Sequence, residues 1–129
     1  MAQTFLTLGA LNGLLAVALG ALGAHSVQHS VSPQLYSAFE TAVQYHGMHV
    51  PALLVVGLLA LHHPSRILFW SGVLFLAGIF LFSGSLYLLA LTQFKWLGPV
   101  TPVGGLSLMG GWLTLGLAAW RLPLEPNRR

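Results

Sequence analysis

Cysteine and aspartate are both absent from the chain, and charged side chains are few. The lack of cysteine excludes disulfides, thiolate metal sites, iron–sulfur clusters and cysteine nucleophiles. The lack of aspartate excludes a Ser-His-Asp set for acyl transfer. A phosphate-cradling glycine loop is also missing, because the glycines lie within apolar segments. We therefore predict a protein with no catalytic site and no cofactor.

Charge is scarce on a chain that is 56% apolar, since its 129 residues include five Lys or Arg and two Asp or Glu. This is too little charge for the surface of an ordinary soluble protein. The isoelectric point near 10.0 arises from scattered cations, with no basic stripe and no interleaved aromatics that could follow a phosphate backbone. We exclude a nucleic-acid partner and expect the lipid bilayer to surround most of the chain.

Four apolar segments are each long enough to cross hydrocarbon, which requires about 20 helical residues. They predict an all-α fold, a four-transmembrane-helix bundle forming one domain in a bacterial plasma membrane, with helices at about residues 4–24, 33–61, 66–92 and 102–122. Ser32-Pro33 and Thr101-Pro102 each pair a capping residue with a proline, which is typical of a helix start. The polar segments 25–31 and 92–100 are expected to be connections.

Lys and Arg are distributed unequally between the two sides of this topology. Arg66, Arg121 and the two arginines of the C-terminal tail share one side with the N-terminus, while Lys95 lies on the other. Cytoplasmic loops carry an excess of Lys and Arg. Both termini are therefore predicted to be cytoplasmic.

Small residues form a stripe along one face of the first helix and another along the fourth. Such stripes allow helices to approach closely, and the neighbour can belong to the same bundle or to a partner. The packing positions are Gly9, Gly13 and Gly20 on the first helix and Gly104 and Gly111 on the fourth. Asn12 borders the first stripe, and we expect its amide to bond across a helix interface.

Polar side chains gather in the outer half of the predicted bundle. They form a candidate polar cavity or interface that consists of His25, Glu40, Gln44, Tyr45, His46, His49, Ser83, Ser85, Tyr87 and Thr101. Helical angles place Glu40 and Gln44 on one side of the second helix. The opposite side carries Tyr45, His46 and His49. One group is expected to face the bundle interior and the other a different neighbour, because lipid exposure of either is costly.

Several chemical roles remain open for these groups. Glu40 is the only acid before the tail, and it can act as a proton carrier or cation ligand, or simply bond to nearby donors. His46 and His49 can bind a metal with help from His25 or His29, supply an axial haem ligand, or form interhelical hydrogen bonds. Their spacing matches no complete ligand set, so we predict no metal site. Pro51 cannot donate a backbone hydrogen bond and predicts a kink beside the two histidines.

Four motifs in the chain resemble the YgdD/YwdK-type small inner-membrane proteins, a family defined by a domain of unknown function. The motifs are Gly20–His25, Tyr45–His49, Phe82–Leu91 and Thr101–Gly105. The resemblance covers almost the whole chain and implies a four-helix plasma-membrane protein, with similar proteins in mitochondria, and no established activity or cofactor. It places motif positions at His25, Tyr45, His49, Ser83, Gly84, Ser85, Tyr87, Thr101, Pro102, Gly104 and Gly105. The chain departs from the family pattern at Gln44 and His46.

Three functional hypotheses follow. The first is a non-enzymatic accessory or assembly subunit that packs its glycine stripes and polar outer face against another integral membrane protein, or forms a homo-oligomer. The second is a small transporter or channel-like protein in which Glu40, Gln44 and His49 line an outward cavity. The third is metal or haem binding through His25, His46 and His49.

Overall fold

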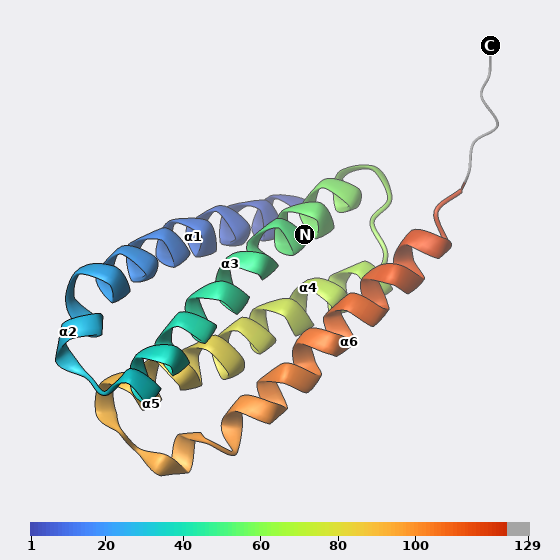
Figure 1. Cartoon of the computed structure of the whole chain (residues 1–129). Coiled ribbons are helices and arrows are strands. Elements are labelled where there is room, and N and C mark those ends of the chain that lie inside the picture. Colours follow the sequence, from blue (N-terminus) through green and yellow to red (C-terminus); the bar gives the residue numbers. More distant parts are fainter. Residues whose placement is uncertain (124–129) are drawn as a thin grey trace.

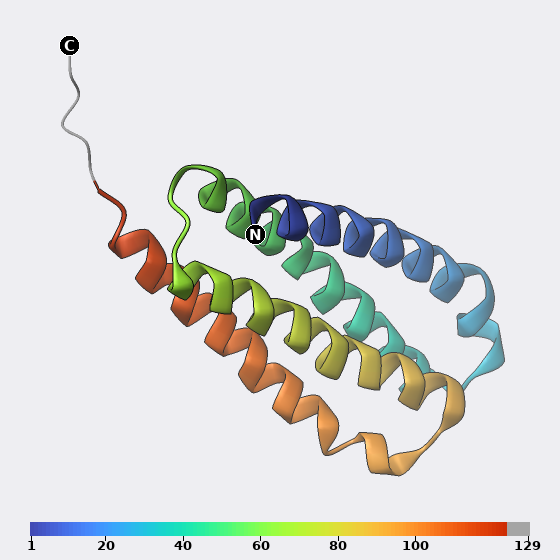
Figure 2. The same cartoon turned by 180° about the vertical axis from the view of Figure 1, so that it is seen from behind.

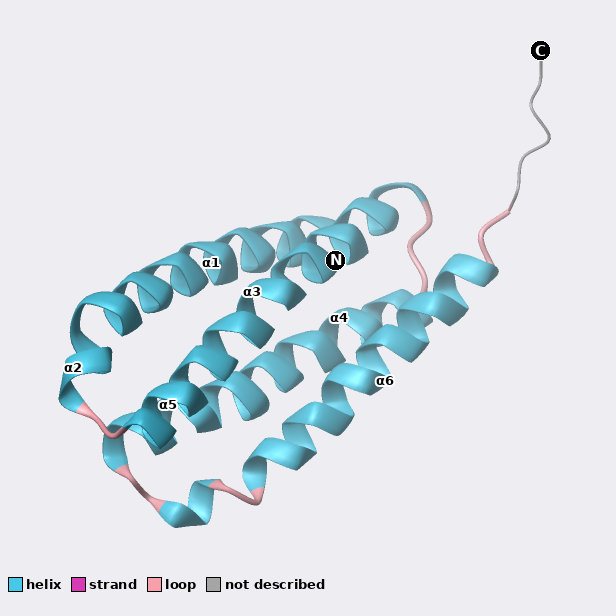
Figure 3. Cartoon of the chain, in the orientation of Figure 1, coloured by secondary structure: helices cyan, strands magenta, loops and turns pink. Residues whose placement is uncertain are grey.

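A computed structural model describes residues 1–123 of the chain, so Glu125, Arg128 and Arg129 of the tail lie outside the described residues. Those 123 residues contain helices and no strand (Figure 3). Four helical segments are long and apolar enough to cross a membrane, at Ala2–Ser30, Pro33–His62, Arg66–Thr92 and Lys95–Trp120. The all-α, four-transmembrane-helix prediction is confirmed.

Two of these segments contain a π-helical turn that divides them into shorter elements. The elements in chain order are α1 (Ala2–Leu22), η1 (Gly23–Val27), α2 (Gln28–Ser30), α3 (Pro33–His62), α4 (Arg66–Gly78), η2 (Ile79–Ser83), α5 (Gly84–Thr92), η3 (Lys95–Leu97) and α6 (Val100–Trp120). The turns η1 and η2 are π-helical, and η3 is a short 3₁₀ helix.

The long helices run antiparallel to their chain neighbours (Figures 1 and 2). The first segment packs along α3, α3 packs on α4 and α5, and α4 packs along α6. As a result α1 and α6 form the two edges of the bundle and α3 lies inside it. The N-terminus, the α3–α4 turn and the C-terminal end of α6 lie at one end of the molecule, which we call the terminal end. The α2 and η3 elements lie at the opposite end.

Two predicted connections differ from the structure. Segment 25–31 is helical as far as Ser30, because η1 continues the helix that the polar residues were expected to end. The last helix begins at Val100 with Pro99 as its N-cap, and the Thr101 side chain does not cap it. Instead the Thr101 hydroxyl lies 2.7 Å from the Ser85 hydroxyl on α5. The cap expected at Ser32 is present, since its hydroxyl accepts a hydrogen bond from the Leu35 amide at 3.3 Å.

Close-packed apolar side chains fill the bundle interior. Phe39, Leu53, Val56 and Phe75 have no exposed surface, and they come from α3 and α4. The outward surfaces are also apolar, and Trp120 at the end of α6 is 90% exposed. A soluble monomer rarely exposes so many large apolar residues, whereas hydrocarbon solvates them. The surface is thus that of a multi-pass membrane protein.

The glycine stripes lie against helices of the same chain. A Cβ added at Gly9 would lie 2.8 Å from Leu54 of α3, and one added at Gly111 would lie 2.7 Å from the ring of Phe75. Gly13 and Gly20 face Val50 and Val43 of α3, and Gly104 lies against the backbone of η2. Neighbouring helices of the same chain therefore cover these glycines on both stripes. A partner protein would therefore have to dock elsewhere.

Candidate functional site

His46 joins three helices near the centre of the bundle. Its side chain is 3% exposed. Its Nδ1 atom lies 3.0 Å from the Tyr87 hydroxyl of α5, and its Nε2 atom lies 3.1 Å from Oδ1 of Asn12 on α1. The Asn12 amide nitrogen donates to the Leu8 carbonyl at 2.8 Å, which fixes the orientation of the amide. We call Asn12, His46 and Tyr87 the His46 triad.

The His46 triad can satisfy the imidazole in both of its charge states. Oδ1 of Asn12 can only accept, so Nε2 of His46 carries a hydrogen and donates to it. In neutral His46 the other nitrogen then accepts from the Tyr87 hydroxyl. In the protonated form both nitrogens donate and the Tyr87 oxygen accepts instead. The change requires only that the Tyr87 hydroxyl hydrogen rotate away from His46.

His49, one helical turn further along α3, has a different arrangement. Its Nδ1 atom donates to the Tyr45 carbonyl at 2.6 Å, and its Nε2 atom accepts from the indole N–H of Trp112 on α6 at 3.0 Å. A carbonyl only accepts and an indole only donates, so both bonds can form only when the imidazole is neutral. His49 is 2% exposed and both of its nitrogens have partners. His49 in this arrangement links α3 to α6 through its hydrogen bond with Trp112.

The two histidines lie near the middle of the membrane span. His46 and His49 flank the midpoint of Pro33–His62, each within roughly 2 Å of it along the axis at 1.5 Å per residue. His46 lies just on the Pro33 side of this midpoint and His49 just past it. Glu40 and Gln44 lie nearer the Pro33 end of α3.

Hydroxyl groups supply the other polar links between helices. Ser83 in η2 donates to the Ala42 carbonyl of α3 at 2.9 Å, and Ser85 bonds to Thr101. Ser71 of α4 and Ser107 of α6 each donate to a carbonyl of the other helix. Among residues 1–123, no buried side-chain nitrogen or oxygen lacks a hydrogen-bond partner. These candidate residues thus hold helices together.

Glu40 and Gln44 are exposed on the other side of α3. They line a groove of about 390 Å³ between α3 and the α1–η1 segment, which we call the Glu40 groove. Gly20, Gly23 and Ala24 form its opposite wall. The Glu40 groove contains neither His46 nor His49, so it is not a cavity that combines Glu40, Gln44 and His49.

The remaining candidates are dispersed. His25 is exposed on η1, and Tyr45 lies at the edge of the buried face with its ring centroid 4.6 Å from that of Phe82. Within the described part of the chain, no three His, Cys, Asp or Glu side chains lie close enough to hold one metal ion. The structure does not bring together the ligand set proposed from His25, His46 and His49, because the three residues face different directions.

Comparison with known proteins agrees with the fold described above, because the matching relatives are named as membrane proteins. Residues 19–105 match the model of the family described as "Protein of unknown function (DUF423)". The chain is 44% identical over 119 residues to the UPF0382 membrane protein SAB0533 of Staphylococcus aureus, with 92% of this chain and 97% of the relative covered. It is also 44% identical over 119 residues to the UPF0382 membrane protein YwdK of Bacillus subtilis, with 91% and 96% covered. The chain belongs to this DUF423 family. No solved structure matches.

Two partners of the histidines lie outside the segment that matches the DUF423 family model. These are Asn12, which precedes residue 19, and Trp112, which follows residue 105. The role of Asn12 was indicated by an amide inside an apolar helix. Nothing in the sequence indicated Trp112, since a tryptophan in an apolar helix is as easily explained by lipid contact. Ser71 and Ser107 were likewise not recognised as links between α4 and α6.

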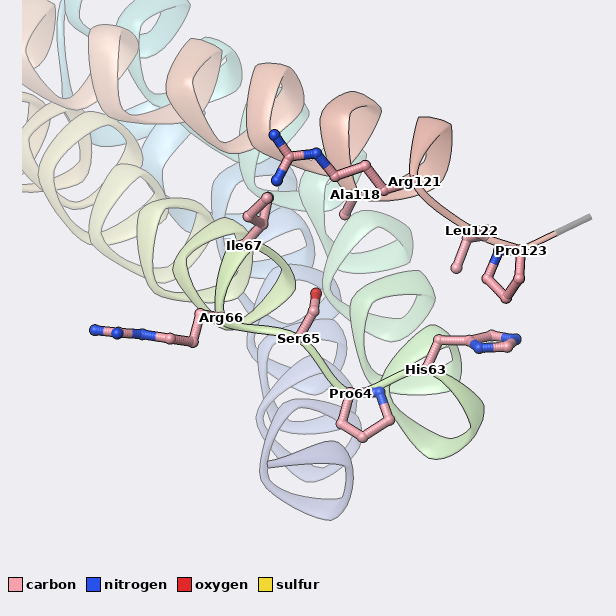
Figure 4. A pocket seen from close by; sticks show the side chains of 9 residues that line it. All are labelled: His63, Pro64, Ser65, Arg66, Ile67, Ala118, Arg121, Leu122 and Pro123. Atoms are coloured by element: carbon pink, nitrogen blue, oxygen red, sulfur yellow. The ribbon is translucent and has the colours of Figure 1, made fainter.

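Another cavity lies at the terminal end, between the α3–α4 turn and the end of α6. It has a volume of about 450 Å³ and includes His63, Arg66 and Arg121 among its lining residues. Figure 4 shows that the side chains of Arg66 and His63 point in opposite directions, while Arg121 reaches back over Ile67. The cations therefore do not converge on one anion. They are placed as separate anchors at the aqueous edge.

The membrane orientation can be tested with single-cysteine variants. The chain contains no cysteine of its own, so a thiol reagent labels only the introduced residue. His29→Cys places a thiol at the end opposite the termini, and His63→Cys places one at the terminal end. If both termini are cytoplasmic, a membrane-impermeant maleimide labels the residue 29 variant in intact cells and labels the residue 63 variant only after permeabilisation. The reverse pattern would place the terminal end outside.

Proposed function

We propose that the protein is a non-enzymatic accessory or assembly subunit of a larger membrane complex. Its helices form a rigid unit whose interior is closed and whose buried polar groups are satisfied. The observation that carries the proposal is the Glu40 groove, the place in residues 1–123 where an acidic side chain faces away from the bundle.

The closed interior argues against transport by a single chain. Leu53, Val56 and Phe75 have no exposed surface at the level where a solute would have to cross. The polar groups at the same depth, His46 and His49, are bonded to neighbouring helices. A polar solute would meet apolar side chains between the two ends of the described bundle, which makes passage costly.

The chemistry of the Glu40 groove favours a protein partner. Glu40 lies seven residues after Pro33, about 10 Å along α3, and therefore close to the edge of a roughly 30 Å hydrocarbon layer. All other residues lining the groove are uncharged. Tyr36 of the same groove lies beside the Glu40 carboxylate, which remains exposed, and an exposed carboxylate at this depth is stabilised further by a cation or donor from a partner.

Purification from native membranes in mild detergent, followed by mass spectrometry, tests the proposal. Another integral membrane protein should accompany the wild-type chain in stoichiometric amount. Glu40→Ala should reduce its recovery at least about tenfold, equivalent to about 1.4 kcal/mol of binding free energy. Gln34→Ala is the matched control, because Gln34 is exposed at the same end of α3 but outside the groove.

Two results would contradict the accessory role. One is recovery of the chain only as a monomer or homo-oligomer from membranes in which it is correctly inserted. The other is solute-dependent flux in proteoliposomes that contain this chain alone, which would support the transporter hypothesis instead.

A further inference from the structure

A second groove lies on the opposite flank of α1 and opens sideways. It has a volume of about 310 Å³ and is lined by Asn12, Leu15, Leu19, His46, Leu76, Ile79, Phe80, Gly84 and Tyr87. These residues come from α1, α3, α4, η2 and α5. The groove shares no lining residue with the Glu40 groove. The His46 triad contributes its polar surface, so we call it the triad groove.

We propose that the triad groove binds a lipid-soluble small molecule with a ring that bears a carbonyl or hydroxyl group, as in quinones and phenols. The proposal concerns binding only. It does not depend on the accessory role, because the two grooves are separate.

The position of the triad groove requires a ligand that reaches it from the hydrocarbon. Leu15 on one rim is 53% exposed and Phe80 on the other is 78% exposed, so the opening faces the lipid side of the bundle. His46 lies near the middle of its span. A water-soluble ligand would have to cross hydrocarbon to arrive here, which is unfavourable.

The polar groups of the groove have unused hydrogen-bonding capacity. The Asn12 amide has two N–H groups, and one of them bonds to Leu8. The Tyr87 hydroxyl donates to neutral His46, which leaves its oxygen able to accept. No other described residue bonds to these remaining sites. A ligand carbonyl can accept from Asn12, and a ligand hydroxyl can also donate to Tyr87.

The size and walls of the groove fit a ring with a polar edge. Its volume of about 310 Å³ is roughly twice that of an engineered apolar cavity of about 150 Å³ that accommodates benzene. Apolar side chains form the walls, and Phe80 and Tyr87 provide aromatic contacts. An acyl chain would fill such a space but would leave the second N–H of Asn12 and the free lone pair of the Tyr87 hydroxyl unused in a medium that has no water.

The π-helical turn η2 shapes one wall of the groove. It ends at Ser83, so the helix resumes with Gly84, and a Cβ added at Gly84 would meet no atom within 4 Å. A side chain can therefore be added beside the groove without a clash in the fold. π-helical turns inside α-helices are frequent at functional sites.

Binding can be measured with a decyl-substituted benzoquinone in lipid nanodiscs, using decylbenzene as a probe of the same shape without carbonyls. We expect saturable binding of one quinone per wild-type chain above the uptake of empty nanodiscs, and no saturable binding of decylbenzene. Leu15→Trp and Gly84→Leu, which narrow the groove from two sides, should each weaken quinone binding about tenfold or more. Tyr87→Phe should weaken a hydroxylated analogue more than the quinone, because it removes an acceptor.

Gly116→Leu is the control for added bulk, since a Cβ at Gly116 also meets no atom within 4 Å and the residue lies on α6, away from the groove. It should bind the quinone as the wild type does. Saturable binding of both probes with equal affinity would overturn the proposed recognition of a polar ring and indicate a bilayer acyl chain as the occupant. Absence of saturable quinone binding, or wild-type affinity in both groove variants, would overturn the site itself.

Discussion

Gly104→Ala is expected to prevent α6 from docking correctly on the rest of the bundle. A Cβ at this position would overlap the backbone of Leu81 and Phe82 in η2. Backbone atoms of a packed helix cannot move aside as a flexible side chain does, so the two helices would have to separate. Overpacking of a close interface costs about 1–3 kcal/mol, and a backbone clash belongs at or above the upper end of that range. We expect a loss of about 3 kcal/mol or more.

The neighbouring glycine provides the control. A Cβ at Gly105 would lie 3.6 Å from the Phe82 ring, an ordinary contact distance, so Gly105→Ala should change stability by less than about 1 kcal/mol. Both variants add one methyl group to the same turn of α6 and have the same helix propensity effect. Unfolding of purified protein in mixed micelles with increasing SDS, followed by circular dichroism, measures the difference. Equal stability of the two variants would refute the close η2–α6 contact.

The four spans could be predicted from the sequence because hydrocarbon imposes a minimum length of apolar helix. The residues at which the helices begin and end were harder to predict. Polar residues at 25–31 favoured a loop, but backbone groups near a membrane are satisfied more fully in a continuing helix, and η1 provides it. Thr101-Pro102 matched a start signal, yet Pro99 came first and also has no backbone N–H to leave unpaired.

The faces of α3 could be predicted in part as well. Helical angles separated Glu40 from His46 and His49, and the structure buries the two histidines and exposes the glutamate. The partners of these residues could not be derived in the same way. The bonds from His49 to Trp112 and from His46 to Tyr87 span 63 and 41 residues of sequence. They depend on the rotation of each helix about its own axis, and for Tyr87 on α5 the π-helical turn η2 changes that rotation relative to α4.

The hydrogen-bond partners of His46 and His49 suit the two residues to different roles. The Trp112 indole requires His49 to remain neutral, so this residue is suited to a permanent structural contact. The partners of His46 tolerate either charge state and also line the triad groove. If α3 carries a functional histidine as well as a structural one, His46 is the residue that the contacts favour.

His46→Ala is therefore expected to destabilise the bundle strongly. It removes two interhelical hydrogen bonds, leaves Oδ1 of Asn12 and the Tyr87 hydroxyl without their partner, and opens a cavity at the junction of three helices. The lost bonds and the cavity together should lower stability by about 2–4 kcal/mol. Gln44→Ala, on the exposed side of the same helix, should change it by less than about 0.5 kcal/mol. The same SDS titration measures both.

His46→Gln separates hydrogen bonding from proton chemistry. A glutamine amide can donate to Oδ1 of Asn12 and accept from the Tyr87 hydroxyl, as neutral histidine does, but it does not bind a proton near neutral pH. If His46 acts through these two bonds, His46→Gln should retain all but about 1 kcal/mol of the stability that His46→Ala loses. A glutamine variant as unstable as the alanine variant would mean that ring packing, and not the bonds to Asn12 and Tyr87, joins α1, α3 and α5. A stable glutamine variant that no longer binds the quinone probe would instead assign His46 a direct role in the groove.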